Sequence, residues 1–288
     1  MVRSHGTSAP NPNVLDRLLK VIPEDVSPER RALLEPFAHM YLKRLADSEI
    51  PDLPAEQLLA EISDLLDFFD ARPSDTPAIR VFTPHGAECG YETPGSVVQV
   101  VSDDSPFLVD SVTAAVARSG ALVVRHLHPI AGTVRDDSGK LVEIGSARGA
   151  SSRESVQHFE LDRVLSEDGI RSLEDDIAAV LGDIRVVVRD FAPLSEAIKT
   201  MVETAKKSVH HYSFEEISEA VDFLNWLLDD NFVFLGYREY TVMDEGEGLG
   251  VKARPETGLG ILSGRGSEPR SILLKDLPRH LANRYTGG

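Results

Sequence analysis

An apolar run at residues 97–101 leads through an acidic turn into helical spacing, and this junction is the clearest pattern in the chain. The run is almost entirely β-branched, which favours a strand buried on both faces. Ser105 followed by Pro106 predicts an N-cap and the first position of a helix. The apolar residues that follow, Leu108, Val112, Ala115 and Val116, fall on one helical face. The pattern therefore predicts a strand, a turn and an amphipathic helix.

Alternating patterns continue on both sides of this junction. Apolar runs and turn residues predict strands at 121–134, 140–144 and 154–161, and residues 78–82 predict a strand at the edge of the same sheet. A helix is expected from residue 167, with its apolar positions on one stripe. This order is close to the ferredoxin-like, split βαβ plan. The fold class predicted is α+β.

Helices are expected before and after this sheet. The pattern predicts helices within 27–46 and 54–69. A further helix is expected at 193–211, and Ser213 to Glu216 reads as a capping box for the next helix. A long strand is then predicted at 231–242, paired with 249–253, and the glycine-rich residues 258–266 are expected to form a loop.

Several short motifs resemble known families. The order of strand, acidic proline-containing turn and helix resembles the ACT regulatory domain. Over a longer range, from about Val14 to Leu262, the chain resembles the N-terminal segment of the large bacterial NAD-dependent glutamate dehydrogenases. The fragments that carry this resemblance, in their order along the chain, are Asp104–Ser111, His128–Ile130, Glu154–Ser155, Asn231–Arg238 and Gly258–Leu262.

The resemblance implies an organisation in five parts. It implies an ACT-like antiparallel sheet with helices on one face, then a helical connector and the start of a β-rich, PAS-like module. It also favours helix over strand at 183–190, where the residue pattern fits both. The expected parts are a disordered 1–12, a helical segment at 13–72, the ACT-like domain at 78–191, the connector at 193–230 and a partial β-rich module at 231–288.

The acidic turn is the candidate effector-binding site. The free N–H groups of a helix's first turn attract a carboxylate, and neighbouring aspartates suit an ammonium group. Together these groups fit an amino acid. The alternative is that the turn residues only cap the helix. In the ACT pattern a glycine usually follows the turn proline, whereas Phe107 stands here. The candidate residues are Asp103, Asp104, Ser105, Phe107, Leu108 and Asp110.

The amino-acid composition limits the classes of partner that the chain is expected to bind. The net charge of −17 argues against nucleic acid, because binding a phosphate backbone needs clustered Lys and Arg. The single cysteine, Cys89, excludes an internal disulfide and fits a reducing cytoplasm. No apolar run approaches the ~20 residues that span a membrane, and the N-terminus lacks the apolar core of a signal peptide. A soluble, cytoplasmic protein is predicted.

Chemistry-bearing residues are sparse. Gly258 and Gly260 begin a dinucleotide-like fingerprint that lacks its third glycine. His126 and His128 share a strand face, but no third metal ligand accompanies them in the sequence. We therefore predict no catalytic residue, no metal and no cofactor in this segment, with NAD belonging to the full-length parent that the resemblance implies.

The preferred hypothesis, which rests on the resemblance, is a regulatory and oligomerisation region of a large NAD-dependent glutamate dehydrogenase. Its partners would be its own catalytic domain, other subunits of a homo-oligomer and an amino-acid effector. The ending at Gly288 reads as the limit of an excised piece. Two alternatives stay open: a stand-alone amino-acid sensor and a ligand-free structural spacer.

Overall fold

The computed structural model describes residues 12–43, 54–73, 76–244, 246, 249–264, 271–273 and 276. It confirms the α+β fold class. The chain divides into two compact units, residues 1–181 and 182–288. The predicted disorder of residues 1–12 concerns positions outside the described residues, except Pro12, which begins the first helix.

The first unit begins with three helices that pack as a group: α1 (Pro12–Lys20), α2 (Pro28–Leu42) and α3 (Ala55–Asp70). Ser27 caps α2, because its hydroxyl accepts a hydrogen bond of 3.2 Å from the N–H of Arg30. The helices bury a shared apolar core that includes Phe37, Tyr41 and Phe69. This core continues onto one face of a sheet.

The sheet of the first unit has six antiparallel strands. Their order is β1, β2, β6, β4, β5, and β3 pairs with β6 beside β4. The predicted edge strand, β1, pairs with β2 as expected. The central β2 is buried along almost its whole length, as its β-branched composition predicted. The strands are β1 (Ala78–Phe82), β2 (Val97–Asp103), β3 (Val123–Leu127), β4 (Ile130–Arg135), β5 (Leu141–Ser146) and β6 (Arg153–Leu161), with a short helix α4 (Gly86–Cys89) between the first two.

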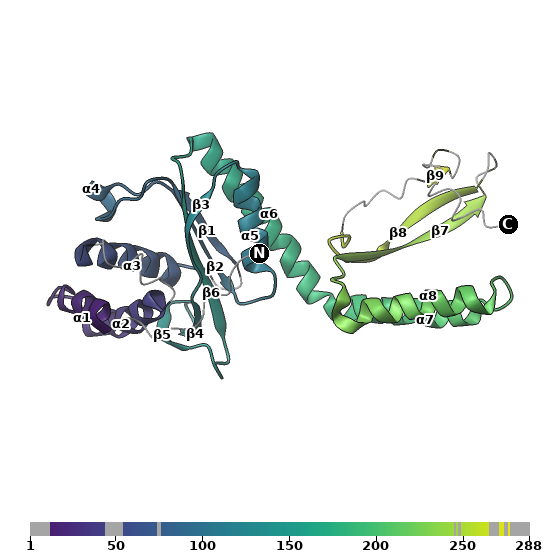
Figure 1. The fold of residues 1–288 in the computed structure, drawn as a ribbon, viewed down its shortest axis with the longest axis horizontal. Helices are drawn as coiled ribbons and strands as arrows, with labels where there is room; N and C mark the ends of the chain where they lie inside the picture. Colours follow the sequence, from purple (N-terminus) through teal and green to yellow (C-terminus); the bar gives the residue numbers. More distant parts are fainter. Residues whose placement is uncertain are drawn as a thin grey trace. The chain divides into compact units, whose positions relative to one another are not determined.

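Helices cover both faces of this sheet (Figure 1). The group α1–α3 packs on one face, where Val101 and Val156 lie opposite each other and join the helical core. The other face carries α5 (Leu108–Arg118) and the start of α6 (Glu167–Arg189). Because α6 is continuous to Arg189, the preference for helix at 183–190 is confirmed.

Two local predictions in the first unit are wrong. The helix after the acidic turn begins at Leu108, so Ser105 is not its N-cap and Pro106 is not its first residue. The strand expected at 121–134 is two strands, β3 and β4, separated at His128 and Pro129. A proline has no N–H to donate to a ladder, which explains why pairing breaks there.

The second unit contains two helices and a small antiparallel sheet. The capping box at Ser213 and Glu216 is confirmed, since the hydroxyl of Ser213 and the carboxylate of Glu216 each bond the other's backbone N–H. The elements are α7 (Phe191–Lys207), α8 (Phe214–Trp226), a π-helical turn η1 (Leu227–Asn231), β7 (Gly236–Asp244), β8 (Leu249–Gly260) and β9 (Ser271–Leu273).

Two boundaries in the second unit also differ from the prediction. The strand expected at 231–242 begins only at Gly236, because η1 extends the preceding helix to Asn231. Gly258 and Gly260 lie within β8 rather than in a loop. At Gly260 the φ angle is +58° and an added Cβ would meet the carbonyl oxygen of Leu235 at 2.2 Å, so this strand end requires a glycine. No described helix is both long enough and apolar enough to cross a membrane.

Candidate functional site

The predicted effector residues lie together where β2 ends and α5 begins, and we call residues 103–110 the β2–α5 corner. Asp103 is the last residue of β2, and Asp110 lies in the first turn of α5. Both side chains are exposed, whereas Leu108 is buried and anchors the helix to the sheet. The first N–H groups of α5 have no partner within the helix itself. The corner thus combines carboxylates with backbone donors that have no partner within the helix.

Phe107 occupies the N-cap position of α5 in an unusual conformation. Its φ angle is +70°, and it is the sole non-glycine residue with positive φ among the described residues. An L-residue in this region costs about 1–2 kcal/mol, which is why glycine is favoured there. The backbone therefore keeps the shape that a glycine would give, while the Phe107 ring is 44% exposed. The departure from the ACT pattern changes the side chain and leaves the turn intact.

Two arginines partly neutralise the corner. Arg72 Nη2 lies 2.8 Å from Asp103 Oδ1, and Arg153 Nη2 lies 3.5 Å from Asp104 Oδ2. Arg72 is shared, because its Nη1 also bonds Glu154 Oε2 at 2.5 Å. Asp110 has neither arginine, so the corner retains an excess of negative charge that suits a ligand ammonium group.

Three of the family-like fragments, far apart in the sequence, meet at the corner. In the sheet register Ser102 lies opposite Ser155, and Ser155 lies opposite Ile130 on its other side. The His128 Nε2 atom is 2.8 Å from the Ser155 hydroxyl. Residues of Asp104–Ser111, His128–Ile130 and Glu154–Ser155 therefore surround one end of the sheet.

Glu154 forms a buried ionic junction beside the corner. It is almost fully buried and receives hydrogen bonds from Arg72, Arg135 and Thr133. Burial alone raises the pKa of Glu154, but these hydrogen bonds outweigh it and lower the pKa below its ordinary value. Arg135 also donates to the backbone oxygens of Phe69 and Asp70 at the end of α3. The junction therefore fixes α3 against the sheet.

A second buried cluster, which the sequence did not predict, lies between α3 and the same sheet face. Arg125 Nη2 donates to Glu61 Oε1 at 2.5 Å and also to Glu160. The hydroxyl of Tyr41 donates to Glu61, and burial followed by the charge of Glu61 raises the pKa of this tyrosine. Burial raises the pKa of Glu160, but its interactions with His158 and Arg125 prevail and bring the pKa to about 2. Glu160 is thus ionised beside the guanidinium of Arg125.

Glu61, His158 and Glu160 offer three ligand atoms within 4.8 Å of one another, a spacing that could hold a metal ion. The hydrogen bonds around His158 instead place a hydrogen atom on the ring nitrogen that would have to bind the metal. Gln99 Oε1 accepts from Arg80 at 2.5 Å, so its Nε2 faces His158 Nδ1, at 3.3 Å, as a donor. His158 Nδ1 is then an acceptor, and its proton is on Nε2, the atom that faces Glu61 and Glu160. The guanidinium of Arg125 adds a fixed positive charge, so we interpret the cluster as a structural ion-pair network.

His126 and His128, which share a strand face, do not form a metal site with a third described ligand. The His126 ring stacks on Phe159 with centroids 4.0 Å apart. Burial, and then the neighbouring His128 and His158, lower the pKa of His126 to about 4. This ring is therefore neutral at pH 7.

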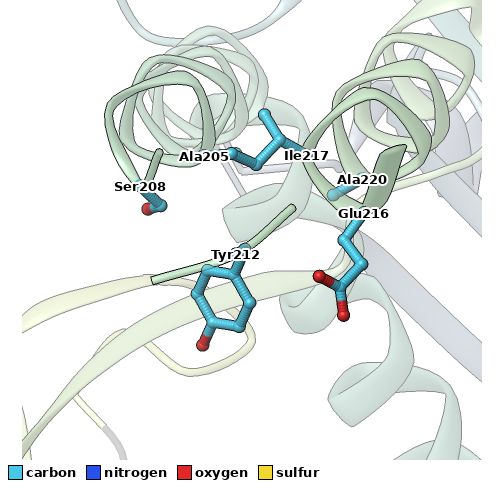
Figure 2. A pocket seen from close by; sticks show the side chains of 6 residues that line it. All are labelled: Ala205, Ser208, Tyr212, Glu216, Ile217 and Ala220. Carbon is cyan, nitrogen blue, oxygen red and sulfur yellow. The ribbon is translucent and has the colours of Figure 1, made fainter. Parts of the chain in front are cut away.

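A pocket of about 330 Å³ lies in the second unit between α7 and α8. In Figure 2 the side chains of Ala205, Ile217 and Ala220 meet between the helices, and the hydroxyl of Tyr212 points away from them. The carboxylate of Glu216 is already used, because it accepts from the Ser213 N–H at 2.9 Å and from its hydroxyl at 2.7 Å. The pocket reflects small residues at a helix crossing and offers little polar chemistry.

Comparison with known proteins confirms the resemblance that the motifs indicated. Residues 37–177 match the family model described as "Glutamate dehydrogenase, ACT1 domain". The NAD-specific glutamate dehydrogenase of Pseudomonas aeruginosa is 34% identical over 215 residues, which make up 74% of this chain and 13% of that protein. That of Halomonas elongata is 27% identical over 237 residues, covering 81% of this chain and 15% of the relative.

A third relative, the NAD-specific glutamate dehydrogenase of Mycobacterium tuberculosis, is 30% identical over 181 residues, or 61% of this chain and 11% of that protein. The chain therefore spans at most 15% of the length of these curated relatives. The matched family residues include the whole sheet of the first unit and the β2–α5 corner.

Proposed function

We propose that this chain is the N-terminal regulatory and assembly region of a large NAD-dependent glutamate dehydrogenase. The observation that carries the proposal is the match of residues 37–177 to the ACT1 domain of glutamate dehydrogenase, supported by relatives named for that activity. The parent enzyme would oxidise L-glutamate to 2-oxoglutarate and ammonia and reduce NAD to NADH. We assign the ACT-like part to residues 78–191, the connector to 193–230 and a further β-rich module to 231–288.

The β2–α5 corner is the proposed effector site, and its ligand is an amino acid. The α-carboxylate would bind the free N–H groups at the start of α5, as anions do at helix N-termini. The α-ammonium would lie against Asp104 and Asp110, while Asp103 stays paired with Arg72. The site between these charged groups would be lined by Ser105, Phe107 and Leu108. Carboxylates and backbone N–H groups close together at the corner would match the two charges of an amino-acid zwitterion.

The division of labour follows from this assignment. Turnover, with NAD, would take place in a catalytic domain elsewhere in the parent polypeptide, in the cytoplasm. This region would contact that domain and other subunits of a homo-oligomer. Effector binding would then shift the active site by a coupling free energy of about 1–3 kcal/mol, or roughly 5–150-fold in affinity.

The test uses the full-length parent enzyme and its glutamate-dependent reduction of NAD. An amino acid is expected to change this activity, and Asp104→Ala combined with Asp110→Ala is expected to remove the response. Asp168→Ala is the control, because this aspartate on α6 is exposed and pairs only with Arg171 among the described ion pairs. It should leave both the activity and the response unchanged. A full response in the Asp104 and Asp110 variant contradicts the site, and glutamate-dependent NADH from the 288-residue chain alone contradicts the division of labour.

A further inference from the structure

Gln157 is a buried amide without partners. It lies on the central strand β6 and is fully buried, yet neither its Nε2 nor its Oε1 has a hydrogen-bond partner among the residues that the structure describes. An unsatisfied buried polar group costs about 1–3 kcal/mol, so such a side chain is a poor choice for packing alone. Gln99, equally buried on β2, shows the contrast, because it accepts from Arg80 and contacts His158.

Gln157 lies on the sheet face that α5 covers. It is opposite Val100, and Ser155 and Ser102 are the next opposed pair on the same face, toward the corner. Both serines are buried. His126, on the neighbouring β3, shares this face and also has a buried ring nitrogen, Nε2, without a partner among the described residues. A strip of polar side chains therefore runs from the end of β2 to Gln157 beneath α5.

The distance along this strip suits a small ligand. Val100 and Asp103 are three residues apart, which is about 10 Å of strand. A ligand held at the corner would have to extend along this strip, between α5 and the sheet, for its side chain to reach Gln157. The β2 and β6 residues on this face from Ser102 and Ser155 to Val100 and Gln157 include no arginine, lysine or carboxylate, so these strands would leave a charged ligand group uncompensated there, at high cost. An uncharged group that both donates and accepts would satisfy Nε2 and Oε1 together.

We propose that Gln157 is a ligand-binding residue of the β2–α5 corner, and that it selects an amino acid with a short amide or hydroxyl side chain. Serine, threonine, asparagine and glutamine form this class. The inference rests on the proposed effector role of the corner and adds the residue that reads the ligand side chain. The corner binds the α-ammonium and α-carboxylate groups of the ligand. Gln157 donates a hydrogen bond to the polar group of the ligand side chain and accepts one from it.

The experiment is a calorimetric titration of the 288-residue chain with these four amino acids, and with alanine, glutamate and lysine for comparison. At least one of these four amino acids should bind in a saturable way, and more tightly than alanine, glutamate or lysine. Gln157→Met should weaken binding tenfold or more, equivalent to about 1.4 kcal/mol. The melting temperature of the Gln157→Met protein should equal that of the unmodified chain or exceed it, because the amide removed by the substitution is unpaired. Gln99→Met is the matched control, expected to lower the melting temperature and to change the affinity less than twofold.

The outcomes separate this inference from the proposed function. If no amino acid binds the unmodified chain, the effector site itself is refuted. If binding is weakened by Asp104→Ala but not by Gln157→Met, the corner stands and the role of Gln157 is overturned. A clear fall in the melting temperature of Gln157→Met would show an amide already satisfied by internal water, which also overturns the role. Tightest binding by glutamate or lysine would overturn the proposed ligand class.

Discussion

Replacing Arg125 with methionine is the sharpest test of the buried ion-pair network. Arg125 is the only guanidinium among the described groups in contact with both Glu61 and Glu160, and the three side chains are between 4% and 11% exposed. Removing one partner of a buried ion pair costs about 3–5 kcal/mol, because charge is left uncompensated. The pKa of Glu160 supports a similar size, since its fall from 4.5 to about 2 corresponds to roughly 3 kcal/mol.

The sign of the pH dependence adds a second criterion. In the unmodified protein the pKa of Glu160 is depressed, so its stabilisation is full above pH 4.5 and is lost as the pH falls toward 2. In Arg125→Met the buried Glu160 carboxylate lacks the guanidinium, so its pKa rises, and its protonation on acidification removes the cost of burying an uncompensated charge. The free energy difference between the two proteins should therefore shrink between pH 7 and pH 4.5.

The assay is urea-induced unfolding followed by circular dichroism at both pH values. Arg163→Met is the matched control, because Arg163 pairs only with Asp162 among the described ion pairs and its side chain is 55% exposed. The control should change the free energy of unfolding by no more than about 0.5 kcal/mol. An Arg125→Met protein within 1 kcal/mol of the original at pH 7, or a difference that grows on acidification, would refute the reasoning.

Three further predictions concern single positions. The pKa of His126 is lowered to about 4, so the free energy of unfolding should fall as the pH drops from 6.5 to 4, by at most about 3 kcal/mol. In unfolding curves measured at a series of pH values, His126→Phe should remove this part of the pH dependence. Because Phe107 has a φ of +70°, Phe107→Gly should be more stable than Phe107→Ala by about 1 kcal/mol in thermal melts, and equal stability would argue against the strained turn. Ser213→Ala removes the capping box and should cost about 1 kcal/mol, seen as faster amide exchange in the first turn of α8, whereas unchanged exchange would contradict the cap.

Much of the secondary structure could be predicted because it follows from local patterns. The β-branched run of β2, the apolar stripe of α5 and the capping box of α8 are each properties of a few adjacent residues. The errors have local causes of another kind. Ser105 has the right chemistry for an N-cap, but the chain makes a further turn through Phe107 before the helix begins. A phenylalanine does not indicate a positive φ angle in the sequence.

The buried charges could not be predicted, because their partners are distant in sequence. Glu61 and Arg125 are 64 residues apart, and Arg72 and Glu154 are 82 apart. Alternation along β6 does place Glu154, His158 and Glu160 on one face, but an alternating polar face usually indicates solvent. Only the packing of α3 over that face makes it an interior. The six candidate effector residues all lie within residues 103–110, so the local sequence alone brings them together, whereas the place of Gln157 is visible only from the sheet register.

The most direct measurement of the central claim, that this region senses an amino acid for a distant catalytic domain, is calorimetric titration of the chain with the common amino acids. We expect saturable binding of at least one of them, and its loss when Asp104 and Asp110 are both replaced by alanine. Binding that persists in that variant, or no binding by any amino acid to the unmodified chain, would contradict the account.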